Sequence, residues 1–213
     1  MYVSGKSKKT VGIVDYGASN LRNIKKSISK IECCSKIITC PEMLTSCDAL
    51  LIPGMGAASS AIEYMKRNNT FESIVAAKET GLGIVGICLG FQMFYESLSE
   101  GEVNGGFGFL KGKVVHLNSI ASYLGSAPNI GWRTVKNCSK AEKQILLHEE
   151  SFYFAHSYTP IQTDENECLA YSIVNEEKIS VVSKKDNVIG CQFHPEKSGP
   201  KGIEFLKWLI HQV

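Results

Sequence analysis

The first half of the chain alternates between two patterns of hydrophobic and polar residues. Short apolar runs that end at turn residues predict buried strands, whereas segments with an apolar residue every three or four positions predict helices. The predicted strands are residues 11–15, 36–39, 49–52 and 83–87, and the predicted helices are residues 21–31, 57–67, 71–79 and 89–98. This regular alternation of strand and helix indicates βαβ units built on a parallel sheet.

The second half of the chain consists mostly of strand-like runs. The predicted strands are residues 108–117, 130–135, 151–157, 168–174, 179–183 and 188–193, and an amphipathic helix covers residues 199–211. Short turns separate several of these runs, so some strands pair antiparallel. We therefore predict an α/β protein with one domain over residues 11–213, after a disordered lead-in at residues 1–10. Its mostly parallel central sheet is flanked by helices and extended by antiparallel strands.

The composition narrows the classes of protein to which the chain can belong. Of its 213 residues, 44% are hydrophobic and 21% are charged, as in an ordinary globular domain. The net charge of +2 gives no electrostatic reason to expect nucleic acid or an anionic membrane as a partner. No apolar run approaches the ~18–20 residues of a membrane span. The eight cysteines form no C-x-x-C pair, which argues against a zinc site. Without an export signal, we expect them to be reduced thiols in the cytoplasm.

One predicted strand leads directly into the motif Gly86-x-Cys88-x-Gly90, which a predicted helix follows. This strand–turn–helix arrangement has the form of a nucleophile elbow, with Cys in place of Ser. The helix N-terminus favours the thiolate of Cys88 and places the amide of Leu89 to donate to an oxyanion. Taken alone, the motif fits a buried structural cysteine equally well.

An overlapping motif, Gly81-x-Gly83-x-x-Gly86, has the spacing of a dinucleotide-binding loop. Such a loop requires a strand before it and a helix after it, whereas here a helix precedes and a strand follows. We therefore predict no dinucleotide site, and we predict no other cofactor and no metal.

His194 and Glu196 are two residues apart, so on an extended backbone both side chains lie on one face. A histidine can act as the base for a cysteine, and a glutamate can orient its imidazole. Alone, the pair fits a surface histidine beside a solvated glutamate, but together with Cys88 it predicts a Cys–His–Glu triad. Among the other histidines, His116 fits a structural role and His156 is ambiguous from its local sequence.

These motifs resemble those of the class I (triad-type) glutamine amidotransferases. Within that class the chain is similar to the HisH family, the glutaminase subunits of imidazole glycerol phosphate synthase. The resemblance extends from Val11 to the end of the chain. Its landmarks are Asp15-Tyr16-Gly17, Asn20-Leu21-Arg22, Pro53-Gly54-Met55-Gly56-Ala57, residues 86–92, Gly131-Trp132, His156-Ser157-Tyr158 and residues 192–199.

The resemblance implies a role for each group of motif residues. Cys88 attacks the carboxamide of glutamine and forms a glutamyl thioester, while His194, held by Glu196, passes a proton to the departing ammonia and then activates water. The other implied sites are a mobile oxyanion strand at Gly54, Met55 and Gly56 that acts with Leu89, glutamine contacts at Gln92, Glu100, His156, Ser157 and Tyr158, and a partner-facing set of Asn129, Trp132, Tyr153 and Lys197.

The sequence departs from the family pattern at several positions outside the triad. Asn129 stands where a histidine is usual, and Phe91 replaces a common methionine. Ala18-Ser19 replaces the usual Met-Gly, and Ala58-Ser59-Ser60 follows the oxyanion strand where Phe-Gly-Asp is common. Asn129 belongs to the implied partner-facing set, so its change bears on the identity of the partner.

The resemblance implies a cytoplasmic glutaminase that hydrolyses L-glutamine to glutamate and ammonia. The pattern occupies almost all 213 residues and leaves no acceptor domain, so a separate synthase is expected to use the ammonia. The implied partner is a TIM-barrel cyclase that makes imidazole glycerol phosphate and aminoimidazole carboxamide ribotide in histidine biosynthesis, joined as a heterodimer. Two alternatives remain open: an ammonia donor to another synthase, such as one that amidinates a nucleotide sugar, and a non-catalytic regulatory homologue.

Overall fold

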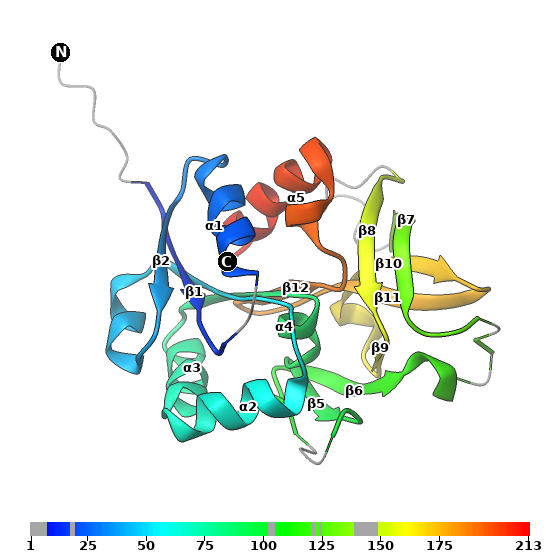
Figure 1. Ribbon diagram of the computed structural model, residues 1–213, viewed down its shortest axis with the longest axis horizontal. Helices are drawn as coiled ribbons and strands as arrows, with labels where there is room; N and C mark the ends of the chain where they lie inside the picture. Colours follow the sequence, from blue (N-terminus) through cyan, green and yellow to red (C-terminus); the bar gives the residue numbers. More distant parts are fainter. Residues whose placement is uncertain (1–7, 18–19, 102–104, 121, 124, 139–148) are drawn as a thin grey trace.

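A large mixed sheet forms the centre of the computed structural model, which describes residues 8–17, 20–101, 105–120, 122–123, 125–138 and 149–213 (Figure 1). The strands of this sheet are β1 (Thr10–Val14), β2 (Cys34–Ile38), β3 (Ala49–Ile52), β4 (Gly83–Ile87), β7 (Asn129–Asn137), β8 (Ser151–His156), β10 (Cys168–Val174), β11 (Glu177–Lys185) and β12 (Val188–Cys191). Their order across the sheet is β2-β1-β3-β4-β12-β11-β10-β7-β8. The predicted α/β class is confirmed.

The direction of pairing changes at β12. The strands from β2 to β12 pair in parallel, and the strands from β12 to β8 pair antiparallel. The parallel part is formed by the first half of the chain together with β12, and the antiparallel part by the second half, as the two sequence patterns predict. Because β12 lies beside β4, the segments that follow these two strands emerge next to each other at the same edge of the sheet.

Helices cover both faces of the parallel part (Figure 1). They are α1 (Leu21–Ser29) and α5 (Gly199–His211) on one face, and α2 (Ala58–Arg67), α3 (Thr70–Glu79) and the short α4 (Leu89–Gln92) on the other. Strand β3 is apolar at every position because both of its faces are buried. Leu51 packs into the core under α1 and α5, whereas Leu50 and Ile52 pack into the core on the opposite face. A strand buried on both faces needs apolar residues at every position.

A second, smaller sheet lies beside α4 and differs from the sequence prediction. Its strands are β5 (Tyr95–Leu98), β6 (Leu110–His116) and β9 (Tyr158–Gln162), in the order β5-β6-β9. The predicted helix over residues 89–98 is therefore wrong beyond Gln92. Met93, Phe94 and Tyr95 are all fully buried, whereas a surface helix buries only the residues on one face. Strand β9 was not predicted because it contains Pro160, which an edge strand tolerates.

The last residues of the predicted lead-in contact the fold. Thr10 already belongs to β1, and the amine of Lys9 donates to the carbonyl oxygen of Ile210 at the end of α5 (2.9 Å). The rest of the predicted lead-in, residues 1–7, lies outside the described residues. Within the part of the chain that the structure describes, no helix is long and apolar enough to cross a membrane.

Candidate active site

Cys88 lies at the turn between β4 and α4, in a backbone conformation that side-chain-bearing residues rarely adopt (φ 49°, ψ −104°). Its amide donates to the carbonyl oxygen of Cys191 at the end of β12 (2.8 Å). The neighbouring chain approaches so closely that a Cβ at Gly90 would lie 2.1 Å from the carbonyl oxygen of Ile52. The strained turn of the predicted elbow is therefore present, held by packing against β3 and β12.

His194 and Glu196 follow β12 and are almost completely withdrawn from solvent. His194 Nδ1 lies 2.9 Å from Glu196 Oε1, and the two side chains are 1% and 0% exposed. Burial lowers the pKa of His194, but the neighbouring Cys88 thiolate and Glu196 carboxylate outweigh this effect and raise the pKa to about 10. Within the described residues, Nε2 of His194 has no hydrogen-bond partner. The arrangement favours a protonated, positively charged imidazole beside the sulfur of Cys88, as a catalytic cysteine–histidine pair requires.

A cavity of about 300 Å³ opens beside Cys88. It is lined by every residue predicted for the oxyanion strand or for glutamine contacts: Gly54, Met55, Gly56, Leu89, Gln92, Glu100, His156, Ser157 and Tyr158. These residues come from four separate parts of the sequence, which therefore meet at one hollow next to the thiol. Glu100 also accepts a hydrogen bond from the amide of Ala58 at the start of α2 (2.9 Å), which fixes its carboxylate at the rim.

A chain of side-chain amides connects this cavity to the sulfur of Cys88. Gln92 Nε2 donates to the carbonyl oxygen of Tyr158 (2.7 Å) and to Gln192 Oε1 (3.0 Å). Because a carbonyl oxygen only accepts hydrogen bonds, the NH₂ group of Gln92 must face Tyr158, and the oxygen of Gln192 must then face Gln92. The NH₂ group of Gln192 therefore points at Cys88 Sγ, 3.5 Å away. Gln192 is fully buried, so its NH₂ group is fixed beside the sulfur.

A second hydrogen-bond chain determines the protonation of His156 at the end of β8. Arg133 Nε donates to Asn129 Oδ1 (3.1 Å), so the NH₂ group of Asn129 faces His156 Nε2 (2.9 Å). His156 Nδ1 then carries the proton and donates to the carbonyl oxygen of Tyr158 (2.8 Å). Burial is the main cause that lowers the pKa of His156 to about 4. His156 is therefore a neutral, fixed wall of the cavity.

The side chain of Asn129 does not lie where the sequence predicts it. Asn129 is only 2% exposed and points inward to His156, whereas its neighbour Ile130 is 55% exposed. At this point β7 directs a polar side chain inward and an apolar one outward. The inward position suits Asn129 because its buried amide bonds to Arg133 and His156. The expectation that this side chain contacts a partner is therefore corrected to an inward, supporting position.

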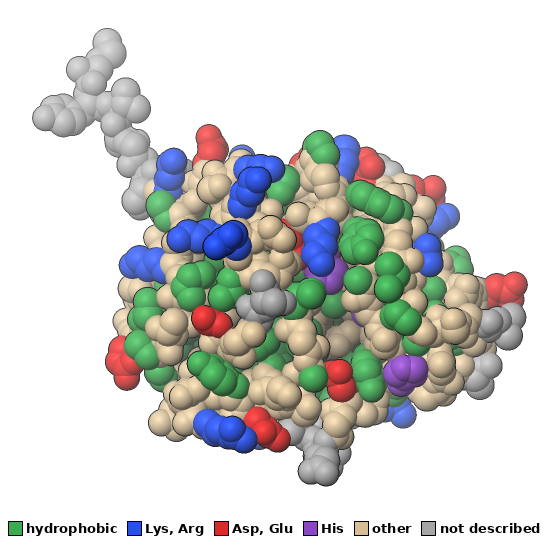
Figure 2. Space-filling model, in the orientation of Figure 1, with side chains coloured by type: hydrophobic (Ala, Val, Ile, Leu, Met, Phe, Trp, Pro, Cys, Tyr) green, Lys and Arg blue, Asp and Glu red, His purple; other side chains and the backbone are tan. Residues whose placement is uncertain are grey.

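The other residues of the predicted partner-facing set lie at the surface beside the site. Trp132 is 54% exposed and its ring stands edge-on to that of Tyr153, with centroids 6.3 Å apart. The amine of Lys197 lies 4.0 Å from the sulfur of Met55 in the predicted oxyanion strand. Figure 2 shows hydrophobic side chains gathered over β7 and β8, with basic side chains beside them. We call Ile130, Trp132, Tyr153 and Lys197 the rim patch.

Two residues of the first βα turn support the site and were not predicted to do so. Asn20 Nδ2 donates to Glu196 Oε1 (2.7 Å), the same oxygen that accepts from His194. Tyr16 donates its hydroxyl to the carbonyl oxygen of Pro53 (2.5 Å), next to the predicted oxyanion strand, and burial raises the pKa of this phenol. Both residues belong to landmark motifs of the sequence, which was the signal available for finding them.

Comparisons with known proteins agree with this geometry. The family model described as "Glutamine amidotransferase class-I" matches residues 12–213. Curated proteins named "Imidazole glycerol phosphate synthase subunit HisH" from Lactococcus lactis and Prochlorococcus marinus are 35% and 34% identical to the chain. These alignments cover 96% and 93% of the chain and 100% and 94% of the relatives.

Solved structures share the fold at lower sequence identity. A "Crystal structure of glutamine amidotransferase" has a TM-score of 0.72 at 17% identity and covers 95% of the chain and 99% of its own. The "Structure of PurLQS from Thermotoga maritima" also has a TM-score of 0.72, at 19% identity, over 96% of the chain and 99% of its own.

Proposed function

The chain belongs to the class I glutamine amidotransferases and, among them, to the HisH family, and we propose that it is the glutaminase subunit of an imidazole glycerol phosphate synthase in histidine biosynthesis. In this role it hydrolyses L-glutamine to glutamate and ammonia. The observation that carries the proposal is the buried His194–Glu196 pair next to Cys88, whose thiol opens onto a cavity lined by the expected substrate residues.

In the first half of the reaction, the Cys88 thiolate attacks the carboxamide carbon of glutamine. The negative charge that develops on the carboxamide oxygen is stabilised by the amide of Leu89 and by an amide of the Gly54–Gly56 segment near Met55, which line the same cavity. One such donor contributes roughly 10²–10³ to the rate. The His194 imidazolium gives its proton to the leaving nitrogen, so that ammonia departs and a thioester remains on Cys88.

In the second half of the reaction, neutral His194 accepts a proton from water and the resulting hydroxide attacks the thioester carbonyl. Cys88 leaves as a thiolate and glutamate is released. Glu196 keeps the imidazole in the orientation that presents Nε2 to the sulfur, through the 2.9 Å hydrogen bond to Nδ1. Asn20 in turn donates a hydrogen bond to Oε1 of Glu196 and holds this carboxylate in place.

Residues of the cavity wall orient the substrate in this proposal. Gln92, His156, Ser157 and Tyr158 contact the glutamine, largely through the backbone of the last three, and Glu100 pairs with the α-ammonium group from the cavity rim. Neutral His156 adds no positive charge beside the His194 imidazolium, so it does not oppose the thiolate–imidazolium pair.

The ammonia passes directly to a cyclase subunit with a TIM-barrel fold, and the two chains form a heterodimer in the cytoplasm. Free ammonia is protonated in neutral water and loses its nucleophilicity, which favours transfer inside a complex. The rim patch supports this docking site, because exposed Ile130 lines the cavity, exposed Trp132 packs edge-on against Tyr153, and Lys197 approaches Met55 of the oxyanion strand.

Replacing the nucleophile tests the chemistry. Cys88→Ala is expected to abolish glutamine-dependent product formation by the complex and to leave ammonia-dependent product formation unchanged, because only the glutaminase step needs the thiol. The measurement compares both rates in the reconstituted complex, with Cys34→Ala as a control at an exposed cysteine. Residual glutaminase activity in a clean Cys88→Ala preparation would refute the assignment.

Replacing the rim lysine tests the docking site. Lys197→Ala is expected to weaken binding to the cyclase by about 2–5 kcal/mol if the lysine pairs with a buried carboxylate of the partner. Lys201→Ala, on the exposed surface of α5, is the matched control. Titration of each variant with the cyclase gives the affinity, and an unchanged affinity for Lys197→Ala would show that this face is not the interface. Binding to a nucleotide-sugar amidinating synthase instead would identify the alternative partner.

A further inference from the structure

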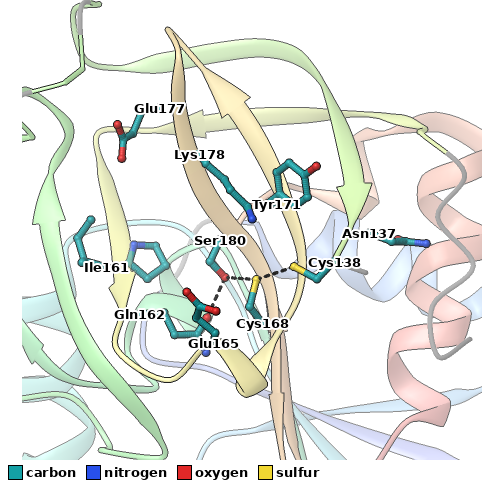
Figure 3. Close-up of a pocket in the computed structure, with 11 residues that line it drawn as sticks. Asn137, Cys138, Ile161, Gln162, Glu165, Cys168, Tyr171, Glu177, Lys178 and Ser180 are labelled. Atoms are coloured by element: carbon teal, nitrogen blue, oxygen red, sulfur yellow. Dashed lines mark hydrogen bonds between the residues drawn. The ribbon is translucent and has the colours of Figure 1, made fainter. Parts of the chain in front are cut away.

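A cavity of about 570 Å³ lies apart from the active site, between β9, β10 and β11 and the end of β7 (Figure 3). None of the residues proposed above for catalysis, substrate contact or docking lines it. Its polar wall includes Gln162, Glu165, Lys178 and Ser180. The proposed glutaminase reaction therefore gives this hollow no role.

Two cysteines meet at the wall of this cavity. Cys138, which follows β7, and Cys168, which begins β10, are free thiols whose sulfurs are 3.2 Å apart. The backbones are already adjacent, since the amide of Cys138 donates to the carbonyl oxygen of Leu169 (2.9 Å). A disulfide bond of about 2.05 Å therefore requires only a small approach of the two sulfurs. Both side chains are half-buried and border the open cavity, so a small reagent can reach them.

The surroundings make the two thiols chemically different. Ser180 Oγ donates to Cys168 Sγ (3.3 Å), and Figure 3 shows this contact in line with the one to Cys138. The hydrogen bond from the Cys138 thiol is the main cause that lowers the pKa of Cys168 to about 7, assisted by Ser180 and by the charge of Lys178. The same pairing raises the pKa of Cys138. Because Ser180 contacts the sulfur of Cys168, we assign Cys168 as the attacking thiolate and Cys138 as the thiol that follows.

We propose that Cys138 and Cys168 form a redox-active dithiol site that exchanges with the disulfide of a small thiol peptide entering this cavity. The Cys168 thiolate attacks one sulfur of the peptide disulfide, giving a mixed disulfide and releasing one peptide thiolate. Cys138 then loses its proton and attacks the sulfur of Cys168, which releases the second peptide thiolate. Two protein thiols become one intrachain disulfide, and the oxidised peptide is reduced to two thiols.

The product links strands β7 and β10 across a sequence separation of 30 residues. Closing a loop of this length restricts the unfolded chain, so the oxidised protein is expected to melt at a higher temperature than the reduced protein. The proposal rests on the thiol pair alone and does not depend on the glutaminase reaction.

Oxidised glutathione is a suitable probe. The reduced full-length protein is incubated with it at pH 7.5, free thiols are blocked, and peptides are mapped by mass spectrometry. We expect a Cys138–Cys168 disulfide, seen as a loss of about two mass units for the two hydrogens removed, at glutathione concentrations that leave Cys34 and Cys40 mostly reduced. Absence of this disulfide, or equal modification of all exposed cysteines, would overturn the proposal.

Single substitutions test the order of attack. Cys138→Ser is expected to trap one glutathione on Cys168 because no second thiol can displace it. Cys168→Ser removes the partner that raises the pKa of Cys138, so Cys138 is expected to be modified in this variant, but less than Cys168 is in the first variant, because Ser180 contacts only the sulfur of Cys168. Equal labelling in the two variants, or no labelling of Cys168 in Cys138→Ser, contradicts the assigned roles. Cys34→Ser is the control and should form the Cys138–Cys168 disulfide as the unmodified chain does.

Discussion

The two parts of the sheet that meet at Cys88 hold their site residues by different means. The parallel strands β3 and β4 position the nucleophile through backbone packing, with glycines where the chains approach most closely and a strained turn at the thiol. The antiparallel strands β7 and β8 and the segment after β12 instead use chains of side-chain hydrogen bonds. One part fixes where the sulfur lies, and the other determines where the protons and charges lie.

This difference predicts different consequences for substitutions in the two parts. A change in the backbone-packed part disturbs the fold, because the neighbouring groups are carbonyls that cannot move away. A change in the hydrogen-bonded part leaves the fold nearly intact and alters a pKa or a pH dependence. The predictions below test this division, beginning with the largest effect.

Gly90→Ala is expected to lower the free energy of unfolding by about 3 kcal/mol or more, the upper range for an overpacked core. The added Cβ would lie 2.1 Å from the carbonyl oxygen of Ile52 and 3.0 Å from that of Pro53. Urea unfolding measures the change. Gly105→Ala is the matched control, because there a Cβ meets its nearest neighbour at 3.6 Å. Equal stabilities of the two variants would contradict the role given to packing at the elbow.

The second prediction concerns the stability of the chain in mild acid. The folded-state pKa of His156, about 4, lies below the ordinary value of 6.5. Its contribution to stability is therefore fully present above pH 6.5 and is lost as the pH falls toward 4. We expect the free energy of unfolding to fall by about 2–3 kcal/mol from this residue over that window.

Substitution of the buried histidine separates its contribution from those of the carboxylates. His156→Gln keeps a donor and an acceptor but cannot gain a charge, so its stability should depend less on pH between 6.5 and 4. The half-buried His116 supplies the control, and His116→Gln should retain the full acid dependence of the unmodified chain. Parallel pH profiles for all three proteins would show that His156 is not the group responsible.

The same division explains how far the sequence predicts the structure. The elbow at Cys88 and the pair His194–Glu196 are local motifs that can be recognised within a few residues, although Pro195–Lys197 forms a 3-10 helix in place of the extended backbone expected there. The continuous apolar runs and the helical patterns likewise predict the strands and most of the helices of the parallel part. Each of these features depends on contacts between near neighbours in sequence or on uniform burial.

The contacts of the supporting residues could not be predicted from local sequence patterns, because their partners are distant in sequence. Asn20 and Glu196 are 176 residues apart, and Tyr16 and Pro53 are 37 apart. Asn129 is the clearest case, since the family resemblance assigns it to the partner-facing surface. Its burial depends on His156 and Arg133, which satisfy both ends of its amide. The hydrogen-bonded part of the site can therefore be described only from the three-dimensional structure.

The smallest expected effect concerns Gln192, whose amide points at the sulfur of Cys88. In Gln192→Glu a carboxylate replaces the donor, and a negative charge beside the thiolate disfavours the charged form of the thiol. We expect the pH midpoint for alkylation of Cys88 by iodoacetamide to rise by about one unit, which corresponds to about 1.4 kcal/mol. Gln192→Leu removes the donor without adding charge and should raise the midpoint by less.

The readout must resolve single cysteines, because the chain contains eight of them. Peptide mapping after short exposure to iodoacetamide at each pH gives the rate at Cys88 alone. Gln212→Glu, which adds the same charge near the end of the chain, controls for the change in net charge and should leave the midpoint where it is. If Gln192 only fills space, Cys88 will be alkylated in both variants with the same pH midpoint as in the unmodified chain. A midpoint that rises in the order leucine then glutamate will show that this side chain acts on the charge of the sulfur.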